Sequence, residues 1–255
     1  MKTIILAGGF GTRLAEYTNL IPKPMVEIGG HPILWHIMNI YSKYGYDDFV
    51  IALGYKGDVI KDYFLNYYAL NNDFEVDLTD GSIKYINEKK KNWKVTLIDT
   101  GSNSMTGGRV KRLKECIGNN PFMLTYGDAV SDINIKELVD FHKAHKKIGT
   151  VTSVRPTARF GELAIDDENT VESFQEKPQT TQGWINGGFF VFEPEFFDFI
   201  TDDSTILERE PLSNLSKQSN LVAFKHSGFW QSMDTVRDRA VLEEICSNKN
   251  IPWLK

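Results

Sequence analysis

The sequence predicts an α/β protein with a mixed, mostly parallel sheet that is flanked by helices and carries β-hairpin insertions. Apolar runs of strand length alternate with amphipathic helical segments early in the chain, and this order favours parallel strands with helices on both faces. Two later stretches alternate apolar and polar residues on both sides of a short polar turn, which indicates hairpins. No linker rich in proline, glycine or serine divides the 255 residues. We therefore expect a single domain, 1–255, with a hairpin and loop segment inserted at about 73–108.

Each expected element follows from its local pattern. Continuous apolar runs bounded by glycine or polar residues indicate buried strands, and apolar residues spaced three and four apart indicate helices. We expect strands at 3–6, 48–53, 94–98, 122–126, 150–154 and 221–226, and one within 184–193 that follows Asn186-Gly187-Gly188. We expect hairpins that pair 74–78 with 82–86 and 161–165 with 170–175. We expect helices at 33–45, 58–70, 108–116, 135–146, 194–200, 206–218 and 235–247, and a loop at 228–234.

The composition argues against several classes of partner. A net charge of -5 and an isoelectric point near 5.6 provide no general attraction to nucleic acid or to an anionic membrane. The sequence has no apolar run long enough to span a membrane and no signal-peptide pattern at its amino terminus, so we expect neither a membrane span nor secretion. Cys116 and Cys246 lie far apart without metal-ligand spacing, which is typical of reduced thiols in a cytoplasmic protein.

A glycine-rich loop follows the first expected strand. Gly8, Gly9 and Gly11 leave backbone N–H groups bare at the carboxyl edge of the sheet, where open α/β folds bind ligands and successive N–H groups hold anions. Arg13 adds a guanidinium group that suits phosphate. Leu14 stands where a dinucleotide fingerprint needs its third glycine, and no Gly-Lys-Ser/Thr closes the loop as in a P-loop. The loop therefore predicts a phosphate site for a nucleotide rather than a dinucleotide-dependent oxidoreductase.

Charged residues elsewhere in the chain could complete this site. Lys23 lies between Pro22 and Pro24, and we expect this segment to be extended and stiff and to hold the lysine in one direction. Asp128 and Asp234 each lie at or just after the end of an expected strand. Mg²⁺ in nucleotide sites prefers one or two carboxylates together with phosphate oxygens, so these aspartates are the candidate metal ligands.

Taken together, these motifs resemble those of the sugar-phosphate nucleotidyltransferases. The glycine loop (6–14) and the Pro-Lys-Pro-Met segment are followed, in the family's order, by Gly127-Asp128, Glu176-Lys177-Pro178 and Trp230-x-x-Met233-Asp234-Thr235. The resemblance covers most of the chain. It implies the Rossmann-like nucleotide-diphospho-sugar transferase fold. It also implies an enzyme that uses Mg²⁺ to transfer a nucleotidyl group from a nucleoside triphosphate to a sugar phosphate, with release of pyrophosphate.

Further stretches resemble the branch of the family that uses CTP and glucose 1-phosphate, namely residues 99–109, 126–132, 160–162, 185–192 and 228–235. The thymidylyl and uridylyl branches usually have leucine where this chain has Tyr126, and a different base-contact stretch at 99–109. The resemblance implies that the product is CDP-glucose, the first intermediate towards CDP-linked dideoxyhexoses of lipopolysaccharide O-antigens. Two alternatives stay open. One is the same reaction with UTP or dTTP; the other is a catalytically silent subunit that senses nucleotide sugars, which the presence of all the candidate charged residues disfavours.

The chemistry explains why these residue types are needed. A sugar phosphate is mostly dianionic at pH 7, so it can attack the α-phosphorus without a general base, and the obstacle is repulsion between two anions. Positive groups and in-line positioning remove that obstacle. We therefore expect Arg13, Lys23, Asp128 and Asp234 to be the catalytic residues. The aspartates would bind Mg²⁺, Arg13 would bind the β- and γ-phosphates, and Lys23 would bind the α-phosphate.

The resemblance also assigns the binding residues. Nucleotide contacts are expected from Leu6, Ala7, Gly8, Gly9, Phe10, Gly11, Thr12, Arg13, Lys23, Ser104, Thr106, Gly107 and Arg109. Ser104, Thr106 and Gly107 would lie near the cytosine. Lys177 would bind the phosphate of glucose 1-phosphate, and the sugar hydroxyls would bond to Glu162, Asn186 and Gly187. Arg109 is either a phosphate ligand or a residue of a subunit interface. Because family members are generally oligomeric, we expect a homo-oligomer such as a hexamer.

Overall fold

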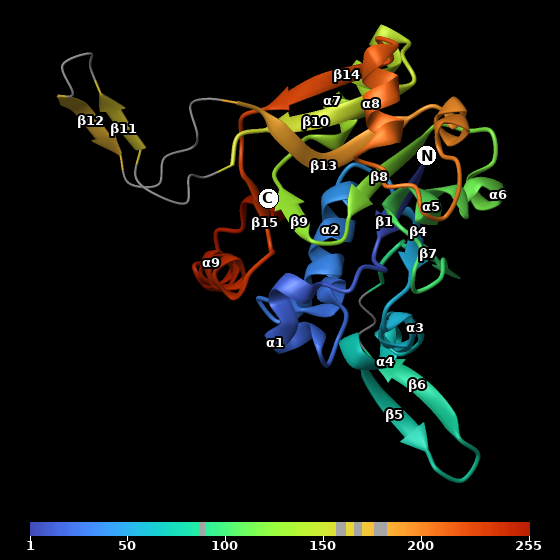
Figure 1. Ribbon diagram of the computed structural model, residues 1–255. Coiled ribbons are helices and arrows are strands. Elements are labelled where there is room, and N and C mark those ends of the chain that lie inside the picture. The colour runs from blue at the N-terminus through green and yellow to red at the C-terminus, as the bar shows by residue number, and fades with distance from the viewer. Residues whose placement is uncertain (87–89, 157–161, 166–169, 176–182) are drawn as a thin grey trace.

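A seven-stranded sheet forms the centre of the computed structural model, which describes residues 1–86, 90–156, 162–165, 170–175 and 183–255 (Figure 1). The strand order is β14–β10–β13–β8–β1–β4–β7. The strands are β1 (Lys2–Leu6), β4 (Asp48–Leu53), β7 (Lys94–Asp99), β8 (Phe122–Tyr126), β10 (Gly149–Val154), β13 (Ile185–Phe192) and β14 (Leu221–His226). All seven strands were expected from the sequence, and the boundaries of six agree to within one residue. β13 begins at Ile185 and includes Asn186-Gly187-Gly188, after which the strand was expected to start.

The sheet is mixed but mostly parallel. β1 runs parallel to β4 and β8, β4 runs parallel to β7, and β10 runs parallel to β14. β13 is antiparallel to both of its neighbours, β8 and β10. Between β1 and β4 the chain passes through α2 (Ile33–Ser42), and between β4 and β7 through α3 (Gly57–Leu65) and α4 (Tyr67–Asn71). The expected α/β class with a mostly parallel, helix-flanked sheet is confirmed.

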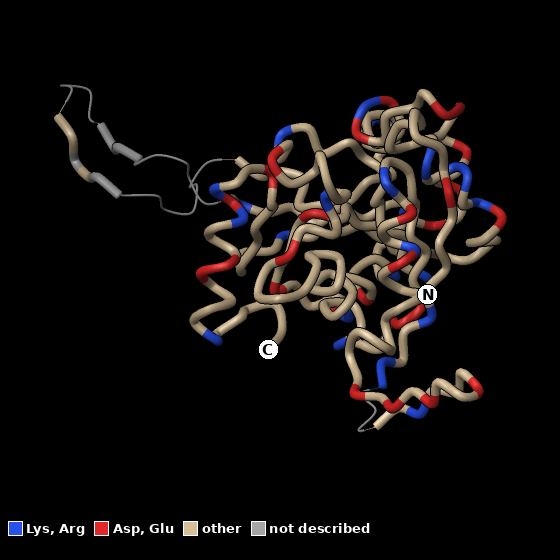
Figure 2. Tube along the Cα trace, turned by 90° about the horizontal axis from the view of Figure 1, so that it is seen from below, with Lys and Arg blue, Asp and Glu red and all other residues tan. Residues whose placement is uncertain are grey.

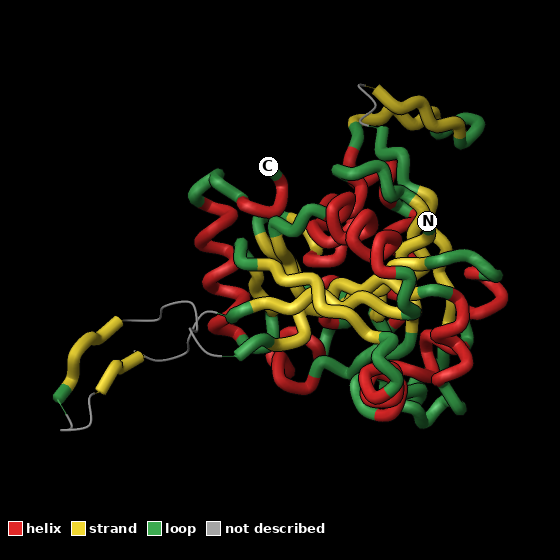
Figure 3. Tube along the Cα trace, turned by 90° about the horizontal axis from the view of Figure 1, so that it is seen from above, coloured by secondary structure: helices red, strands yellow, loops and turns green. Residues whose placement is uncertain are grey.

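Strand side chains alternate between two hydrophobic clusters, one on each face of the sheet. In β1, Ile5 belongs to one cluster and Ile4 to the other, and in β4 Ile51 and Val50 divide in the same way. Helices lie on both sides of the sheet (Figure 3). Because both faces are covered, these strands read as continuous apolar runs, which is why the sequence revealed them.

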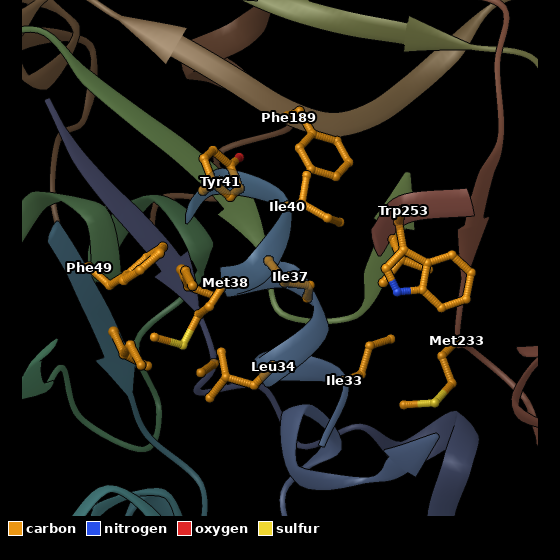
Figure 4. Close-up of a cluster of buried hydrophobic side chains, with 14 of the residues drawn as sticks. Ile33, Leu34, Ile37, Met38, Ile40, Tyr41, Phe49, Phe189, Met233 and Trp253 are labelled. Carbon is orange, nitrogen blue, oxygen red and sulfur yellow. The ribbon is translucent and has the colours of Figure 1, made fainter. Parts of the chain in front are cut away.

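Helix α2 packs its apolar side chains into the larger cluster. Ile33, Ile37 and Tyr41 recur at helical spacing and are fully buried. They lie in one cluster with Phe189 of β13 and Trp253 near the carboxyl terminus (Figure 4). The rings of Tyr41 and Phe189 stack with their centroids 6.0 Å apart. This cluster therefore joins the first helix, the middle of the sheet and the end of the chain.

Several helices are shorter than their patterns predict. The helix expected at 108–116 is two helices, α5 (Thr106–Lys111) and α6 (Lys114–Ile117), and the helix expected at 206–218 is only α8 (Glu210–Lys217). Pro211 lies in the first turn of α8, where its missing N–H is not needed, so the helix begins there. Residues 194–199 form a 3₁₀ helix. Helices α7 (Ile135–His145) and α9 (Val236–Ser247) agree with expectation.

Both expected hairpins are present. β5 (Asp73–Asp77) pairs with β6 (Ser82–Ile86) and projects from the body of the protein, and β11 (Glu162–Ile165) pairs with β12 (Val171–Gln175) (Figure 1). Other short elements are α1 (Ala15–Thr18), β2 (Glu27–Ile28), β3 (His31–Pro32) and the 3₁₀ helices Thr12–Leu14 and Pro252–Leu254. Basic and acidic residues are interspersed along the trace in Figure 2, so a phosphate ligand depends on a local group of charges.

A small two-stranded sheet lies where a loop was expected. β15 (Trp230–Ser232) pairs antiparallel with β9 (Ala129–Ser131), so the expectation of a loop at 228–234 is wrong. Each strand has only three residues, and the partners lie about 100 residues apart in the chain. Local alternation cannot reveal so short a pair.

Candidate active site

A cavity of about 530 Å³ opens at the carboxyl ends of β1 and β8. All the expected nucleotide contacts except Gly107 line it, namely residues 6–13, Lys23, Ser104, Thr106 and Arg109. Asp128 and Tyr126 line it as well. The position agrees with the general rule that open α/β sheets bind ligands at the carboxyl ends of their strands.

The glycine loop needs glycine at two positions for packing. Gly11 has a φ of +63°, and a Cβ there would lie 2.8 Å from Thr18 Cγ2. A Cβ on Gly8 would lie 2.2 Å from a guanidinium nitrogen of Arg109. A Cβ on Gly9 would meet no atom of the described residues within 4 Å. The backbone around Gly9 is therefore the part of the loop left open for a ligand.

Lys23 lies at the centre of a cluster of ion pairs. Its Nζ is 2.6 Å from Asp128 Oδ2 and 2.7 Å from Asp234 Oδ1, and the residue is only 9% exposed. Arg13 bonds to the same oxygen of Asp234 at 2.9 Å. Two positive and two negative charges therefore balance locally. We call these four residues the charged end of the cavity; Arg13, Lys23 and Asp128 line it, and Asp234 bonds to the first two of them.

The segment that carries Lys23 is a tight turn, so the expectation of an extended piece is wrong. Pro22 is extended, but Lys23–Met25 form a 3₁₀ helix. Met25 N donates to Pro22 O (2.8 Å) and Val26 N donates to Lys23 O (3.1 Å). The fixed φ of Pro24 suits a helical turn as well as an extended chain, and a first turn does not need its missing N–H.

The pairing of β9 with β15 brings the two aspartates together. Asp128 lies between β8 and β9, Asp234 follows β15, and Met233 N donates to Asp128 O (2.8 Å). Asp234 also precedes α9, where Asp234 N donates to Asp238 Oδ2 (3.0 Å) beside a capping box formed by Thr235 and Asp238. The backbone at both aspartates is thus held by strand pairing and by a helix cap.

Electrostatics keep Lys23 and Asp234 ionised. Burial alone would lower the pKa of Lys23, but the carboxylates of Asp128 and Asp234 outweigh burial and raise this pKa above its usual value. Burial alone would raise the pKa of Asp234, but Lys23 and Arg13 hold it below its usual value. Two carboxylates that converge on one point fit a divalent ion of the Mg²⁺ type, which needs few protein ligands. Within the described ranges, no group of three or more His, Cys, Asp or Glu could hold a metal.

Arg109 lies beneath the glycine loop and is 4% exposed. Its guanidinium donates to Leu53 O (3.0 Å), Thr100 Oγ1 (2.8 Å), Gly101 O (2.8 Å) and Ser102 O (3.2 Å). These bonds join the end of β4 to the segment after β7. Burial lowers the pKa of Arg109, yet a guanidinium remains charged at neutral pH. Arg109 therefore braces the cavity wall from within its own chain, and its assignment to a nucleotide phosphate or to a subunit interface stays a prediction.

Hydroxyl groups line the part of the cavity next to α5. In Figure 1, α5 lies on one side of β1, and β15 and α9 lie on the other. We call Ser104, Thr106 and Tyr126 the hydroxyl end. Ser104 Oγ donates to Thr100 O (2.5 Å). Thr106 Oγ1 donates to Glu208 Oε2 (2.7 Å), and the Tyr126 hydroxyl donates to Glu208 Oε1 (2.6 Å).

The structure describes part of the expected sugar-phosphate set. Asn186 Nδ2 donates to the Tyr126 hydroxyl (3.2 Å), so Asn186 lies beside the hydroxyl end. Gly187 O accepts a bond from Trp230 Nε1 (2.7 Å), which ties β13 to β15. Lys177 lies outside the described residues. Glu162 begins β11, and the placement of its side chain is likewise outside the description.

Sequence reasoning missed two residues of this region as site residues. Tyr126 ends an apolar strand next to the Gly127-Asp128 motif, so its position carried a usable signal. Glu208 lies in a segment without a motif, and only the fold brings it to Thr106. Gly107 was expected near the cytosine, but it is not among the residues that line the cavity. A Cβ on Gly107 would lie 2.8 Å from Thr205 O, so this glycine packs against the segment that carries Glu208 rather than lining the cavity.

This chain is similar in sequence and in fold to known proteins. The glucose-1-phosphate cytidylyltransferase of Salmonella typhi is 51% identical over 99% of this chain and 98% of its own length. The mannose-1-phosphate guanyltransferase of Saccharomyces cerevisiae is 30% identical, over 93% of this chain and 62% of its own length. Among solved structures, HddC from Yersinia pseudotuberculosis is 25% identical with a TM-score of 0.69, covering 98% of this chain and 99% of that one.

None of the helices in the described ranges is long and apolar enough to cross a membrane. The nucleotidyl transferase family model matches residues 2–235, a range that includes the glycine loop, Lys23 and both aspartates. With this match and a relative that is similar from end to end, the chain belongs to the nucleotidyl transferase family.

Proposed function

We infer that this chain transfers a cytidylyl group from CTP to α-D-glucose 1-phosphate, giving CDP-glucose and pyrophosphate. The observation that carries this inference is the 51% identity, over nearly the full length of both chains, to a glucose-1-phosphate cytidylyltransferase. The guanyltransferase relative is much less similar, at 30% identity. We further propose that the CDP-glucose formed serves the synthesis of CDP-linked dideoxyhexoses for lipopolysaccharide O-antigens.

The charged end has the groups that this reaction needs. A sugar phosphate attacks the α-phosphorus in line, and the bond from that phosphorus to pyrophosphate breaks on the opposite side. Lys23 would stabilise the charge on the α-phosphate. Arg13, whose side chain is 71% exposed, can follow the β- and γ-phosphates as they leave. The open backbone at Gly9 would donate N–H groups to the triphosphate.

Asp128 and Asp234 are the proposed holders of Mg²⁺. When bound, the ion neutralises part of the charge of the triphosphate. Both carboxylates bond to Lys23 in this structure, so a metal ion and the ammonium group compete for the same oxygens. Nucleotide phosphates offer Lys23 other partners. We therefore propose that metal and nucleotide enter the site together.

The sugar phosphate would bind on the β13 side of the cavity. Asn186 and Gly187 would bond to the sugar hydroxyls with Glu162, and Lys177 would bind the phosphate. The position of Asn186 beside Tyr126, a residue of the cavity wall, supports this assignment. We keep the remaining expectations as proposals: one domain spanning 1–255, a cytoplasmic location and a homo-oligomer. Exposed apolar side chains on the β5–β6 hairpin, such as Phe74 and Val76, support the last of these.

A nucleotide panel tests the function. Purified protein is incubated with glucose 1-phosphate, Mg²⁺ and one of CTP, UTP, dTTP or GTP, and pyrophosphate release is measured. We expect CTP to give the highest kcat/KM. A higher kcat/KM with UTP or dTTP would refute the cytidylyl assignment. Absence of turnover with every nucleotide, together with retained nucleotide-sugar binding, would favour the silent regulatory subunit instead.

A further inference from the structure

Glu208 uses both carboxylate oxygens to bridge two residues of the cavity wall. Oε2 accepts the Thr106 hydroxyl at 2.7 Å, and Oε1 accepts the Tyr126 hydroxyl at 2.6 Å. Thr106 and Tyr126 belong to α5 and β8, and both line the cavity. The established family chemistry of phosphate transfer does not require this bridge, since Glu208 lies outside the charged end.

The segment that carries Glu208 is held firmly against α5. Gly107 N donates to Thr205 O (2.9 Å), and a Cβ on Gly107 would lie 2.8 Å from that oxygen. A Cβ on Gly108 would lie 2.5 Å from the backbone of Asp203. Two consecutive glycines therefore permit a close approach that larger residues would block. The position of Glu208 follows from this packing, although its own side chain is exposed.

The Tyr126 ring is equally well fixed. Gly188 has a φ of +80°, and a Cβ there would lie 2.6 Å from Tyr126 Cδ2, so the ring occupies the space that glycine leaves. Its hydroxyl oxygen accepts a bond from Asn186 Nδ2 at 3.2 Å. Burial, together with the neighbouring Glu208 carboxylate, raises the pKa of Tyr126, so its hydroxyl stays protonated at neutral pH.

A count of protons and lone pairs shows what these hydroxyls can offer to a ligand. A hydroxyl has one proton to donate and two lone pairs to accept with. Thr106 and Tyr126 both give their proton to Glu208, which is acceptor-only when ionised. Thr106 Oγ1 also accepts from Leu207 N (2.9 Å), which leaves it one lone pair. The Tyr126 oxygen likewise accepts from Asn186 Nδ2 (3.2 Å). Towards a ligand, each oxygen can therefore act only as an acceptor, with at most one remaining lone pair.

We propose that Glu208 is a positioning residue for base selection, because it holds the Thr106 and Tyr126 hydroxyls of the hydroxyl end so that they accept but do not donate hydrogen bonds. This inference rests on the proposed function. A nucleotide whose phosphates lie at the charged end extends its base towards the hydroxyl end of the same cavity. Cytosine carries an amino donor on the ring carbon where thymine and uracil carry a carbonyl acceptor. The hydroxyl oxygens can accept from the amino group of cytosine, whereas the carbonyl of uracil or thymine would find no donor there.

The test compares the ratio of kcat/KM for CTP to that for UTP in the wild type and in Glu208→Gln. A glutamine amide can donate to one hydroxyl oxygen, which frees that hydroxyl proton for a carbonyl on the base. We expect the CTP-to-UTP ratio to fall about 10-fold, the scale of one mismatched hydrogen bond. Glu210→Gln, an exposed neighbour in the first turn of α8, serves as the matched control and should keep the wild-type ratio.

A second pair of variants keeps the inference testable if Glu208→Gln folds poorly. Thr106→Ser keeps the hydroxyl and should keep the ratio, whereas Thr106→Val removes it and should lower the ratio. A loss of overall activity with an unchanged ratio, in either Glu208→Gln or Thr106→Val, would overturn the inference and leave a merely structural role. Failure of the proposed function and failure of the role of Glu208 give different results. A wild type that prefers UTP refutes the proposed function, whereas a wild type that prefers CTP with an unchanged variant ratio refutes only the role of Glu208.

Discussion

The two ends of the cavity are built in different ways. At the charged end, each residue belongs to a short sequence motif, and the four side chains form a balanced cluster around Lys23. At the hydroxyl end, Thr106 and Tyr126 are joined by Glu208, which lies far from both in the chain and belongs to no motif. The charged end suits a reaction shared by many nucleotides, and the hydroxyl end offers a means to tell one base from another.

This difference has a physical origin. Phosphates are the same in every nucleotide, so the charges that bind them can be the same in every member of a family. Bases differ only in a few donors and acceptors, and a protein distinguishes them with a few oriented neutral groups. Changes at the charged end should therefore alter turnover with every nucleotide, whereas changes at the hydroxyl end should alter the choice among nucleotides.

The largest effect should come from Asp128→Asn. The amide keeps the size of the side chain but loses the charge that pairs with Lys23, and we expect kcat to fall about 10³-fold for every nucleotide. Asp234 still pairs with Lys23, so the cost in the free energy of unfolding should be about 1–2 kcal/mol. Pyrophosphate release and thermal unfolding measure the two quantities. Asp140→Asn, on the exposed side of α7, is the control, and unchanged turnover in Asp128→Asn would refute the metal and charge assignment.

Replacing Arg13 and Arg109, which were both expected to bind the nucleotide, should have different effects on activity and stability. Arg13→Met removes a side chain that is 71% exposed, so kcat/KM should fall about 10²-fold while stability hardly changes. Arg109→Met takes the guanidinium donor from two half-buried carbonyl groups, Gly101 O and Ser102 O, which should cost about 3 kcal/mol of unfolding free energy. Leu53 O keeps the hydrogen bonds from Thr100. That cost corresponds to a melting temperature about 5–10 °C lower for a chain of this size. Equal losses of stability in both variants would contradict the contrast between a ligand-facing and a supporting arginine.

The sequence could predict the sheet and the charged end because both depend on local signals. Strands buried on both faces appear as continuous apolar runs, and glycine or proline residues mark the loop at Gly8–Gly11 and the turn at Lys23. Even there, the conformation at Lys23 was misjudged, because proline fits an extended chain and a 3₁₀ turn equally well.

The features that the sequence did not reveal depend on contacts between distant segments. The β9–β15 pair has three residues in each strand, yet it sets Asp128 beside Asp234. The enclosure of Arg109 depends on the close approach of the glycine loop at Gly8. The bridge through Glu208 likewise needs the packing of residues 203–205 on α5. No period or motif in one segment carries such information, because the information lies in the pairing itself.

The smallest effect should appear in metal binding without nucleotide. In the wild type, Lys23 Nζ bonds to both carboxylates at 2.6 and 2.7 Å, so a cation must displace an ammonium group from a cluster whose charges already balance. Lys23→Met removes that competitor and leaves the local charge negative. We expect Mn²⁺ to bind about 10-fold more tightly to the variant than to the wild type in the absence of nucleotide. This corresponds to about 1–2 kcal/mol, the scale of electrostatic attraction near a protein surface. Calorimetry or electron paramagnetic resonance measures the affinity. Lys61→Met, an exposed lysine on α3, should leave Mn²⁺ binding unchanged. If wild-type protein binds Mn²⁺ as tightly as Lys23→Met does, Lys23 does not compete with a cation for these carboxylates. The proposal that metal and nucleotide bind together would then lose its support.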